Sequence, residues 1–375
     1  MNGKNDNKLV TLITSHMNRI RGQESARAAT IPWKREFLKS LLNRKPYLFN
    51  NENQYLSRLI PGSNLNPNLI LPDIKLCETR DDYDLFDFLG IWSSFPTSDR
   101  PGRRMKFFIV DKGHEGTPIM ALGCLSSTVS LLATRDNWIG WAGRSFKEIR
   151  ANNLAYIMDL STCVGIPPYS YVTSGKLLCY SCLSREFRWA YASRYQSQYT
   201  AKLKRLVTDI ALIVVLGAFS RNTPQYRGIT LGGETRFRFA GYTKGYSTFH
   251  IPSGLYDELL TRANIEELSK QRCLDRGGNP KLRMLRTIAR KANINDEYIV
   301  KSGFKRAVFI APTAYNSRTF LLGEDRSLDY YDYSFEEVVE AWKKRWLYTR
   351  YSNNRVLAEI NRFTPSLLSL RNYYE

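Results

Sequence analysis

Four strand-length apolar segments, separated by turns and helical patterns, are the feature that most restricts the fold of this chain. The first two flank a turn at 111–116 and predict an antiparallel hairpin. A polar loop and a helix expected at about 176–194 separate the last two. Strands and helices that alternate in this way predict a mixed α/β fold, with a central mixed sheet and flanking helices. The four segments are 106–110, 118–125, 153–160 and 210–219.

Changes in composition and hydrophobic pattern along the chain predict three regions. Residues 1–70 show apolar positions at helical spacing and end in a stretch rich in Pro, Gly and Asn, which predicts a helical N-terminal region. Residues 71–255 hold the strand-like segments and predict the α/β core. Residues 256–375 alternate basic helical patterns with a strand at 307–311, and predict a basic α+β region.

The charge of the chain is strongly positive, with 55 Lys and Arg against 35 Asp and Glu, or +20 in all. The excess is uneven. Residues 1–58 hold eleven basic against four acidic side chains and 270–310 eleven against three, whereas 73–99 hold seven acidic against two basic ones. Such a surface attracts polyanions. Nucleic acid is the first expectation, and an anionic membrane or a phosphorylated cofactor the alternative.

Several classes of protein are not expected. The first residues lack the apolar segment and cleavage site of a secretory signal. The most apolar run, 210–219, is too short to span a bilayer and reads as a buried strand. Six Cys, mostly in apolar segments, fit unpaired thiols in a reducing cytoplasm. We therefore expect a cytoplasmic protein without a membrane anchor.

A metal site is not expected either. Cys179 and Cys182 form a lone CxxC within a helical segment, and the chain has only three His, which lie far apart in the sequence. A zinc site needs two further ligands. Packing is therefore the simpler role of the two cysteines. No nucleophile–base motif of a hydrolase stands out in the sequence either.

The loop 166–178 connects a predicted strand to a predicted helix and ends in Ser-Gly-Lys. Backbone amides at a helix N-terminus favour phosphate or pyrophosphate, and a lysine can supply the cation. The loop is neither a Walker A motif nor a dinucleotide fingerprint. An ordinary capped turn is the alternative. The candidate cofactor-binding residues are Thr173, Ser174, Gly175 and Lys176.

Residues 236–251 combine cations, aromatic rings, glycines and a histidine. Arg236 and Arg238 alternate with phenylalanines, which places both cations on one face of a predicted strand, as a phosphate-tracking surface requires. A solvated sheet face is the alternative. His250 lies in a strand-like segment. It is expected either to accept a proton in a substrate groove or to form part of a glycine-bent hairpin.

Two further segments carry basic side chains on helices. Around 282–289 apolar residues face one way and arginines the other, and a Lys-Lys-Arg run follows in the last turn of a helix expected at 335–346. With the residues above they form the candidate nucleic-acid-binding set. That set is Arg227, Arg236, Arg238, Lys244, Arg283, Arg286, Arg290, Lys343, Lys344 and Arg345.

A series of segments follows in a characteristic order along the chain. They are RRMKFFIVD, RDNWIGW (135–141), RANNLAYIMD (150–159), VGIPPYSYVTSGKL (164–177), AFS (218–220), GYTKGYSTFHI (241–251), FIAPTAYNSRTFL (309–321) and FEEVVEAWKKRWL (335–347). Their order resembles the Druantia anti-phage system protein A family (DruA). Two positions depart from the family pattern: Ser174-Gly175 stands where the family has a double glycine, and 220–226 differ from a Gly-Arg-Ser-Ser-like stretch.

The resemblance implies a role in bacterial defence against phage, beside other proteins of the system that include a helicase-like subunit. The order of the core is also similar to that of GCN5-related acyltransferases, in which a loop between a strand and a helix holds the coenzyme A pyrophosphate. Residues 157–159 and the loop to Lys176 are the matching part. The resemblance thus implies an acyltransferase-like core.

Three functions are compatible with these features. The first is a defence component that binds nucleic acid, most simply DNA, through basic surfaces, with tyrosines such as Tyr242 stacking on bases. The second is an enzyme that transfers an acyl group from coenzyme A or modifies a nucleotide, with Asp159, Tyr226 and His250 as catalytic candidates. The third is a non-catalytic assembly subunit.

Overall fold

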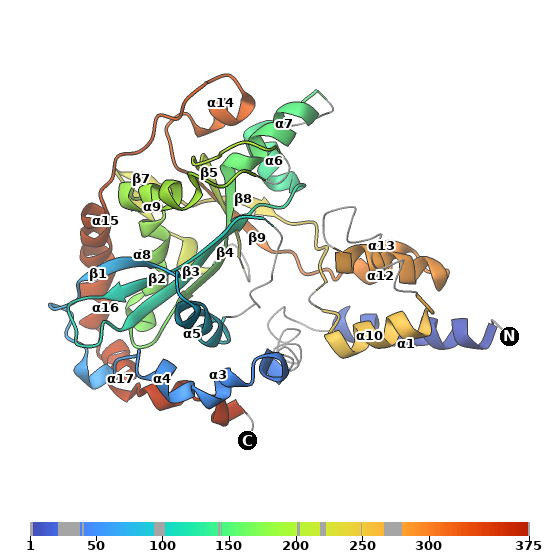
Figure 1. The fold of residues 1–375 in the computed structure, drawn as a ribbon, viewed down its shortest axis with the longest axis horizontal. Helices are drawn as coiled ribbons and strands as arrows, with labels where there is room; N and C mark the ends of the chain where they lie inside the picture. Colours follow the sequence, from blue (N-terminus) through green and yellow to red (C-terminus); the bar gives the residue numbers. More distant parts are fainter. Residues whose placement is uncertain are drawn as a thin grey trace. The chain divides into compact units, whose positions relative to one another are not determined.

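A seven-stranded mixed sheet is the centre of the fold in this computed structural model (Figure 1). The strand order is β1-β2-β3-β4-β5-β9-β8. Successive pairs from β1 to β4 are antiparallel, β4 and β5 are parallel, and β5 and β9 are antiparallel. The expected mixed α/β fold is confirmed. The strands are β1 (Pro72–Leu76), β2 (Arg104–Asp111), β3 (Ile119–Ser127), β4 (Ile157–Gly165), β5 (Leu212–Leu216), β8 (Arg238–Tyr242) and β9 (Ala307–Pro312).

Helices surround this sheet, and one small hairpin, β6 (Thr230–Leu231) with β7 (Glu234–Thr235), precedes β8. The helices are α3 (Tyr47–Asn50), α4 (Glu52–Leu56), α5 (Arg80–Gly90), α6 (Ala133–Ile139), α7 (Lys147–Asn153), α8 (Ser174–Ser181), α9 (Arg185–Tyr195), α14 (Ser317–Leu322), α15 (Phe335–Trp342), α16 (Tyr348–Tyr351) and α17 (Asn354–Arg362). Short 3-10 turns and one π-helical turn, η5 (Lys343–Leu347), complete the path. The structure describes residues 3–21, 38–39, 41–93, 102–141, 143, 145–200, 203–217, 223–248, 250–265 and 280–373.

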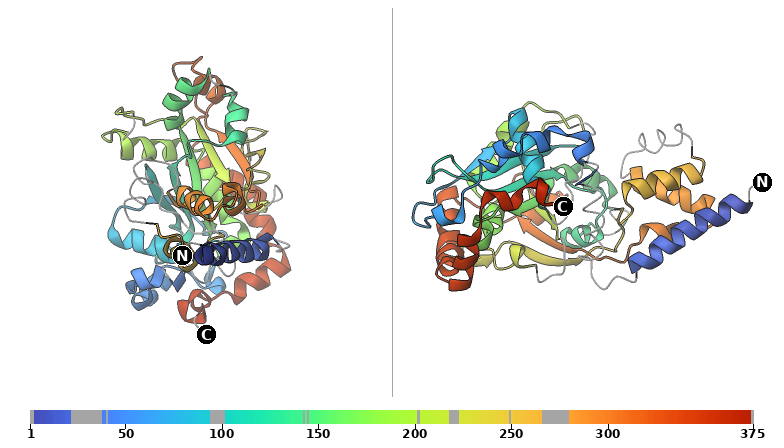
Figure 2. Two further views of the ribbon diagram at one scale, coloured as in Figure 1. Left: turned by 90° about the vertical axis from the view of Figure 1, so that its right-hand side faces the viewer. Right: turned by 90° about the horizontal axis from the view of Figure 1, so that it is seen from below.

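The predicted hairpin is β2 and β3, and its two faces carry different helices. Successive side chains of a strand point to opposite faces of a sheet. Phe107 packs against Phe187 of α9, with ring centroids 4.9 Å apart, and Phe108 packs against Phe86 of α5 at 5.8 Å. Helices α5 and α9 therefore cover opposite faces, and Figure 2 shows the sheet between helices. α8 also packs on β3 and β4, and α15 packs on α8.

A fully buried carboxylate fixes the far end of this hairpin. Asp111 Oδ1 accepts hydrogen bonds from the backbone amides of Leu71 (2.8 Å) and Gly113 (2.9 Å). Its Oδ2 accepts from Tyr169 Oη (2.8 Å) and lies 2.8 Å from His114 Nδ1. Because these four groups come from three places in the chain, one side chain joins the start of β1, the hairpin turn and the segment after β4.

The expected single helix at 176–194 is two helices. α8 ends at Ser181, and Ser184 begins the next helix by accepting a hydrogen bond from Phe187 N on its side chain (3.3 Å). Serine favours this capping role over a helix interior. Helix α5 is capped at its N-terminus, since Thr79 and Asp82 form a reciprocal capping box there.

Contacts within the chain divide it into two units, which we call the helical unit and the sheet unit. The helical unit comprises 1–44, 218–220 and 242–307, and the sheet unit the remaining residues. This division differs from the boundaries expected at 70 and 255. The sheet itself takes β9 from the region that was expected to form a separate C-terminal part.

The helical unit has an apolar core of its own. It is formed by α1 (Gly3–Arg21), α10 (Ser253–Arg262), α12 (Pro280–Lys291) and α13 (Asp296–Val300). Met17, Leu259, Leu285 and Ile288 are among the residues buried in one cluster. Lys291 Nζ donates to the carbonyls of Ala263 and Asn264, each at 3.0 Å, and so satisfies the carbonyl end of α10.

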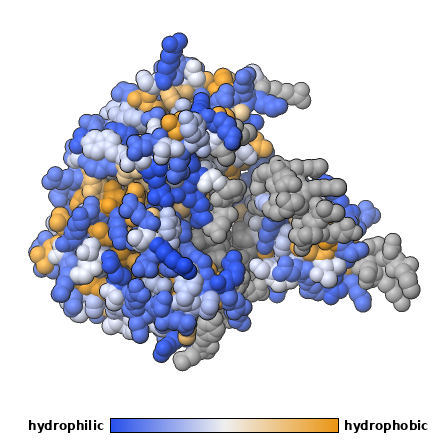
Figure 3. Space-filling view, viewed as in Figure 1, coloured by the Kyte–Doolittle hydropathy of each residue, from blue (hydrophilic) through white to orange (hydrophobic). Residues whose placement is uncertain are grey.

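The face shown in Figure 3 is mainly hydrophilic, with hydrophobic residues gathered in separate patches. Among the helices that the structure describes, none has the length and apolar character needed to cross a membrane.

Asp111→Ala tests the role of the buried carboxylate. The change leaves buried donors without an acceptor, so the free energy of unfolding should fall by about 3 kcal/mol or more. Chemical denaturation measures this value. The control is Asp73→Ala, because Asp73 is partly exposed and pairs with exposed Lys112. That change should lower the free energy of unfolding by less than about 1 kcal/mol, and equal losses would contradict the assignment.

Candidate functional site

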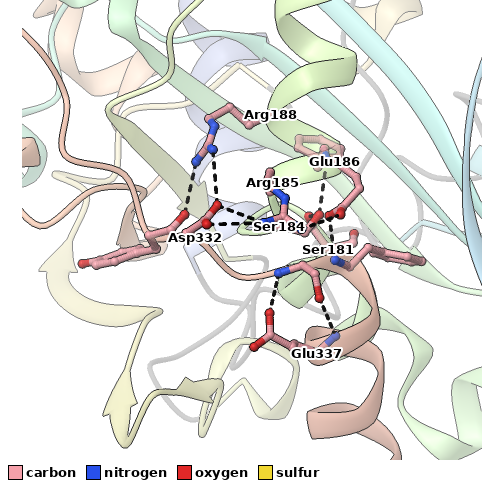
Figure 4. Close-up of polar contacts among 11 residues, drawn as sticks. Ser181, Ser184, Arg185, Glu186, Arg188, Asp332 and Glu337 are labelled. Carbon is pink, nitrogen blue, oxygen red and sulfur yellow. Dashed lines mark hydrogen bonds and ion pairs between the residues drawn. The ribbon is translucent and has the colours of Figure 1, made fainter.

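Helix α15 is held in place at its N-terminus by a network of polar contacts (Figure 4). Ser334 and Glu337 form a capping box: Ser334 N donates to the Glu337 carboxylate (2.7 Å), and Glu337 N donates to Ser334 Oγ (3.1 Å). Glu186, in the first turn of α9, accepts from Phe335 N at 2.6 Å. The start of α15 is therefore fixed to the start of α9.

Two arginines of α9 strengthen this attachment. Asp332 pairs with Arg185 at 3.3 Å and with Arg188 at 3.9 Å (Figure 4). Arg188 also donates to the carbonyl of Tyr331 at 3.1 Å. Because these contacts fix one end of α15, they also determine where its other end carries the Lys-Lys-Arg run.

The far end of α15 widens into the π-helical turn η5. Such turns often occur at functional sites. Trp342, just before it, is fully buried and donates its indole N–H to the carbonyl of Thr173 at 3.2 Å. Lys344 and Arg345 are exposed on the turn, and Lys343 pairs with Glu340 at 3.5 Å.

Lys176 lies buried beneath this turn, with 3% of its surface exposed. Its ammonium donates to the carbonyls of Pro224 and Arg227 and lies 4.2 Å from the ring centroid of Trp346. Burial, with a smaller contribution from nearby arginines such as Arg345, lowers the pKa of Lys176 to about 8. The lysine thus joins α8, the segment before the small hairpin, and η5.

Four cations meet at this point. The positive charges of Arg227, Arg345 and Arg350 are all close enough to lower the pKa of Lys176. Arg227 and Arg345 are exposed. Like charges brought together repel one another, and a bound anion relieves that repulsion. We call these four residues the cation cluster.

A cavity of about 340 Å³ lies beside the cation cluster. Gly228 connects the two: it lines the cavity, and a side chain at this position would lie 3.4 Å from the guanidinium of Arg345 and 3.5 Å from the ring of Trp346. Its φ of +72° also suits glycine. The cavity, here called the aromatic pocket, is lined by Arg227, Gly228, Thr235, Phe237, Phe239 and Phe309.

The predicted cofactor loop is covered rather than open. Ser174 and Gly175 are buried, and a side chain at Gly175 would lie 3.1 Å from Gln225 Nε2. Gln225 is itself held by a 2.6 Å hydrogen bond to the carbonyl of Cys163. The hydroxyls of Thr173 and Ser174 are buried without a hydrogen-bond partner among the described residues. In this structure, therefore, Lys176 binds backbone carbonyls at a place where we expected it to bind phosphate.

The three residues expected to be catalytic lie in different surroundings. Tyr226 packs on Phe309, with ring centroids 5.3 Å apart, and so lies next to the aromatic pocket. Asp159, on β4, accepts a 2.6 Å hydrogen bond from Thr128, which in turn accepts one from the fully buried Arg135 at 2.9 Å. This buried network was not expected from the sequence.

His250 belongs to the helical unit and has 1% of its surface exposed. It lies in a turn rather than in the expected strand. Its Nδ1 lies 3.0 Å from Ser247 Oγ and its Nε2 lies 2.9 Å from the carbonyl of Ile299. Burial lowers its pKa to about 4, so the ring is uncharged at neutral pH.

Arg236 and Arg238 do not share one strand face. Arg236 falls in the bend between β7 and β8 and is 3% exposed. It donates to Tyr333 Oη at 2.9 Å and lies 3.9 Å from the ring centroid of Tyr331. Arg238 remains exposed and lies 3.5 Å from Glu234. Only Arg238 is thus placed to meet a phosphate, because the alternation of Arg and Phe crosses a bend.

The basic residues of α12 lie in the helical unit. The apolar stripe expected there is confirmed, because Met284, Leu285, Ile288 and Ala289 are buried. Arg290 is exposed and pairs with Asp296 at 3.0 Å. Arg283 and Arg286 are half-buried, and Lys244 is exposed in the same unit.

The comparisons with known proteins agree with the resemblance seen in the sequence. The family model "Druantia protein DruA" matches residues 27–323, most of the chain. The chain belongs to the DruA family. It is also similar to the Druantia protein DruA of Escherichia coli (strain UMEA 4076-1), with 26% identity over 298 residues, 78% of this chain and 72% of that protein. No solved structure matches the chain.

Membership of the DruA family supports the expected role in anti-phage defence, beside other proteins of the Druantia system. The family match includes Lys176, Arg227 and the whole aromatic pocket but ends before η5. Three contributors to the site, Gln225, Trp346 and Arg350, were not expected. The residues next to these three in the sequence did not indicate a role in the site, because the groups that they contact lie far away along the chain.

The free thiols agree with expectation within the described part of the chain, where five cysteines are unpaired. Cys163 and Cys179 approach to 3.7 Å between sulfurs, and burial raises the pKa of the Cys179 thiol. Among the described residues no group of His, Cys, Asp and Glu is arranged to hold a metal ion.

Lys176→Met tests whether the lysine is buried as a cation. Between pH 8 and 10.5 the unfolded wild-type chain holds the Lys176 proton more tightly than the folded chain. The free energy of unfolding of the wild type should therefore rise with pH relative to the variant, by on the order of 2 kcal/mol across this window. Chemical denaturation at several pH values measures the difference. Lys147→Met, on exposed α7, is the control and should show no such trend, and a flat difference for Lys176→Met would refute the assignment.

Proposed function

We propose that this protein is a component of the Druantia defence system that binds nucleic acid, with DNA as the expected polyanion. The cation cluster would hold backbone phosphates. The observation that carries this proposal is the convergence of Lys176, Arg227, Arg345 and Arg350, whose charges lower the pKa of the lysine. A phosphate placed against the two exposed arginines would offset the repulsion among the four.

The distribution of charge supports a second contact surface on the helical unit. Its residues whose side chains the structure describes, 7–21, 38–39, 41–44, 242–248, 250–265 and 280–307, hold 15 Lys and Arg against four Asp and Glu. The described residues of the larger sheet unit, between 45 and 373, hold 29 against 23. The helical unit thus carries the greater excess on far fewer residues, which favours sequence-independent attraction to phosphates.

Other proteins of the same system complete the proposed setting, with a helicase-like subunit in the cytoplasm as the expected partner. Nucleic acid held by this protein would be presented to that subunit. Should the protein bind no nucleic acid at low salt yet co-purify with system proteins after nuclease treatment, the third function, an assembly subunit, would replace this proposal.

An enzyme acting on coenzyme A or a nucleotide is the competing proposal. The step from β4 through a loop into α8 supports it, since it is the order on which the acyltransferase resemblance rests. Gln225 and the burial of Ser174 oppose it, because a pyrophosphate at the start of α8 would have to displace that side chain. Calorimetric titration with acetyl-CoA distinguishes the two, and heat of binding would favour the enzyme.

Arg345→Gln and Arg227→Gln test the cation cluster. Each change should weaken binding of a labelled DNA about three- to tenfold and lower the slope of log K against log salt by about 1. Fluorescence anisotropy across a salt series measures both quantities. Arg371→Gln is the matched control, because Arg371 is also an exposed arginine of the sheet unit.

The control variant should keep both the affinity and the slope of the wild type. Equal losses of affinity in all three variants would mean that the cations act only through net charge. Unchanged affinity in the two cluster variants would contradict phosphate binding at this site.

A further inference from the structure

We propose that the aromatic pocket takes a single unstacked nucleobase, so that the protein selects single-stranded or unpaired nucleic acid over intact duplex. This inference rests on the proposed nucleic-acid binding and names the form of nucleic acid bound at the same site. It depends on the chemistry of the pocket walls and on the position of the pocket beside the cation cluster.

The walls of the pocket are aromatic. Phe237 and Phe309 are buried, with 2% and 1% of their surfaces exposed, whereas Phe239 is 38% exposed. Phe239 and Phe309 meet edge to face, with ring centroids 5.9 Å apart. A partly exposed ring beside a buried aromatic floor offers a flat ligand one face on which to stack.

The polar groups of the pocket match a nucleotide more closely than an apolar ligand. Arg227 and Thr235 line the same cavity as the phenylalanines and are exposed. Arg227 also belongs to the cation cluster. One arginine is therefore shared between the place expected for a phosphate and the place expected for a base, and Gly228 both lines the cavity and adjoins Arg345.

The size of the pocket limits what can enter. A volume of about 340 Å³ lies at the low end of the range for small-molecule sites, and suits one base better than a base pair. In a duplex the faces of the bases are covered by their neighbours in the stack, so a base must leave the stack before a side chain can reach its face. Selection against duplex follows from this requirement.

The pocket should tolerate different bases. Every base presents an aromatic face, and stacking carries little sequence information. Among the described lining residues only Arg227 and Thr235 offer side-chain hydrogen-bonding groups, too few to read a base edge fully. Recognition would thus depend on strand state rather than on sequence.

Phe239→Ala in the full chain tests the inference. The variant should bind a single-stranded oligonucleotide about tenfold more weakly than the wild type, while its affinity for a duplex of the same length stays the same. Phe49→Ala is the matched control, because Phe49 is also 38% exposed in the sheet unit but lies on α3. Anisotropy with both labelled nucleic acids measures the affinities.

A second readout follows the base itself. An oligonucleotide that carries 2-aminopurine should lose fluorescence on binding to the wild type, because stacking on an aromatic ring quenches it. Phe239→Leu keeps an apolar side chain and should remove this quenching, and Phe239→Tyr should retain it. Circular dichroism of each variant checks that the fold is preserved.

The outcomes separate this inference from the proposed function. If the wild type binds neither nucleic acid, the proposed function fails. If it binds both equally, depends on Arg345, and does not respond to Phe239→Ala or Phe239→Leu, the proposed function stands and the base pocket is overturned. Loss confined to single strands, together with loss of quenching, supports the pocket.

Discussion

The burial of one lysine beneath a tryptophan determines the geometry of the candidate site. The ammonium of Lys176 binds two carbonyls of the 224–227 segment and faces the ring of Trp346. A charged group away from water is unfavourable unless it is well hydrogen-bonded, so these contacts hold three separate parts of the chain together. Arg227 and Gly228 take their positions from this arrangement, and the same lysine contacts the π-helical turn that carries Arg345.

The same arrangement explains why the site is electrostatically unusual. Three arginines close to a buried lysine repel it. Burial, and to a smaller degree this repulsion, lowers the pKa of Lys176 to about 8. Ordinary surfaces disperse such charges or pair them, as Arg185 and Arg188 are paired with Asp332. Perturbed pKa values of this kind are concentrated at functional sites.

Sequence patterns predicted the parts of the fold that local periodicity controls. The apolar runs at 106–110 and 118–125 are β2 and β3, and the stripe on α12 is buried as expected. The prediction for Arg236 assumed that alternation continues along one strand, and it was wrong because a bend intervenes and Tyr331 and Tyr333 supply a stacking surface from almost 100 residues away. Such long-range partners leave no trace in a local window.

The surroundings of Lys176 differ from those expected for a related reason. A Ser-Gly-Lys sequence at the start of a helix has the residue types of a phosphate site, yet identity alone does not show whether the helix end is open. Gln225 and two backbone carbonyls occupy the space around it here. The cation that the sequence placed on a cofactor thus acts as a structural cation, and the exposed arginines beside it take over contact with an anion in the proposed function.

Net charge and local arrangement then have separate roles in the proposed binding. The helical unit carries the larger excess of positive charge although it is the smaller unit. Charge spread in this way attracts nucleic acid in a salt-dependent manner, whether it is single-stranded or duplex. The sheet unit is nearly balanced overall, but it joins a cation cluster to an aromatic pocket. Selectivity for an unpaired base therefore has to come from the sheet unit, since stacking needs a defined ring and charge alone does not distinguish a single strand from a duplex.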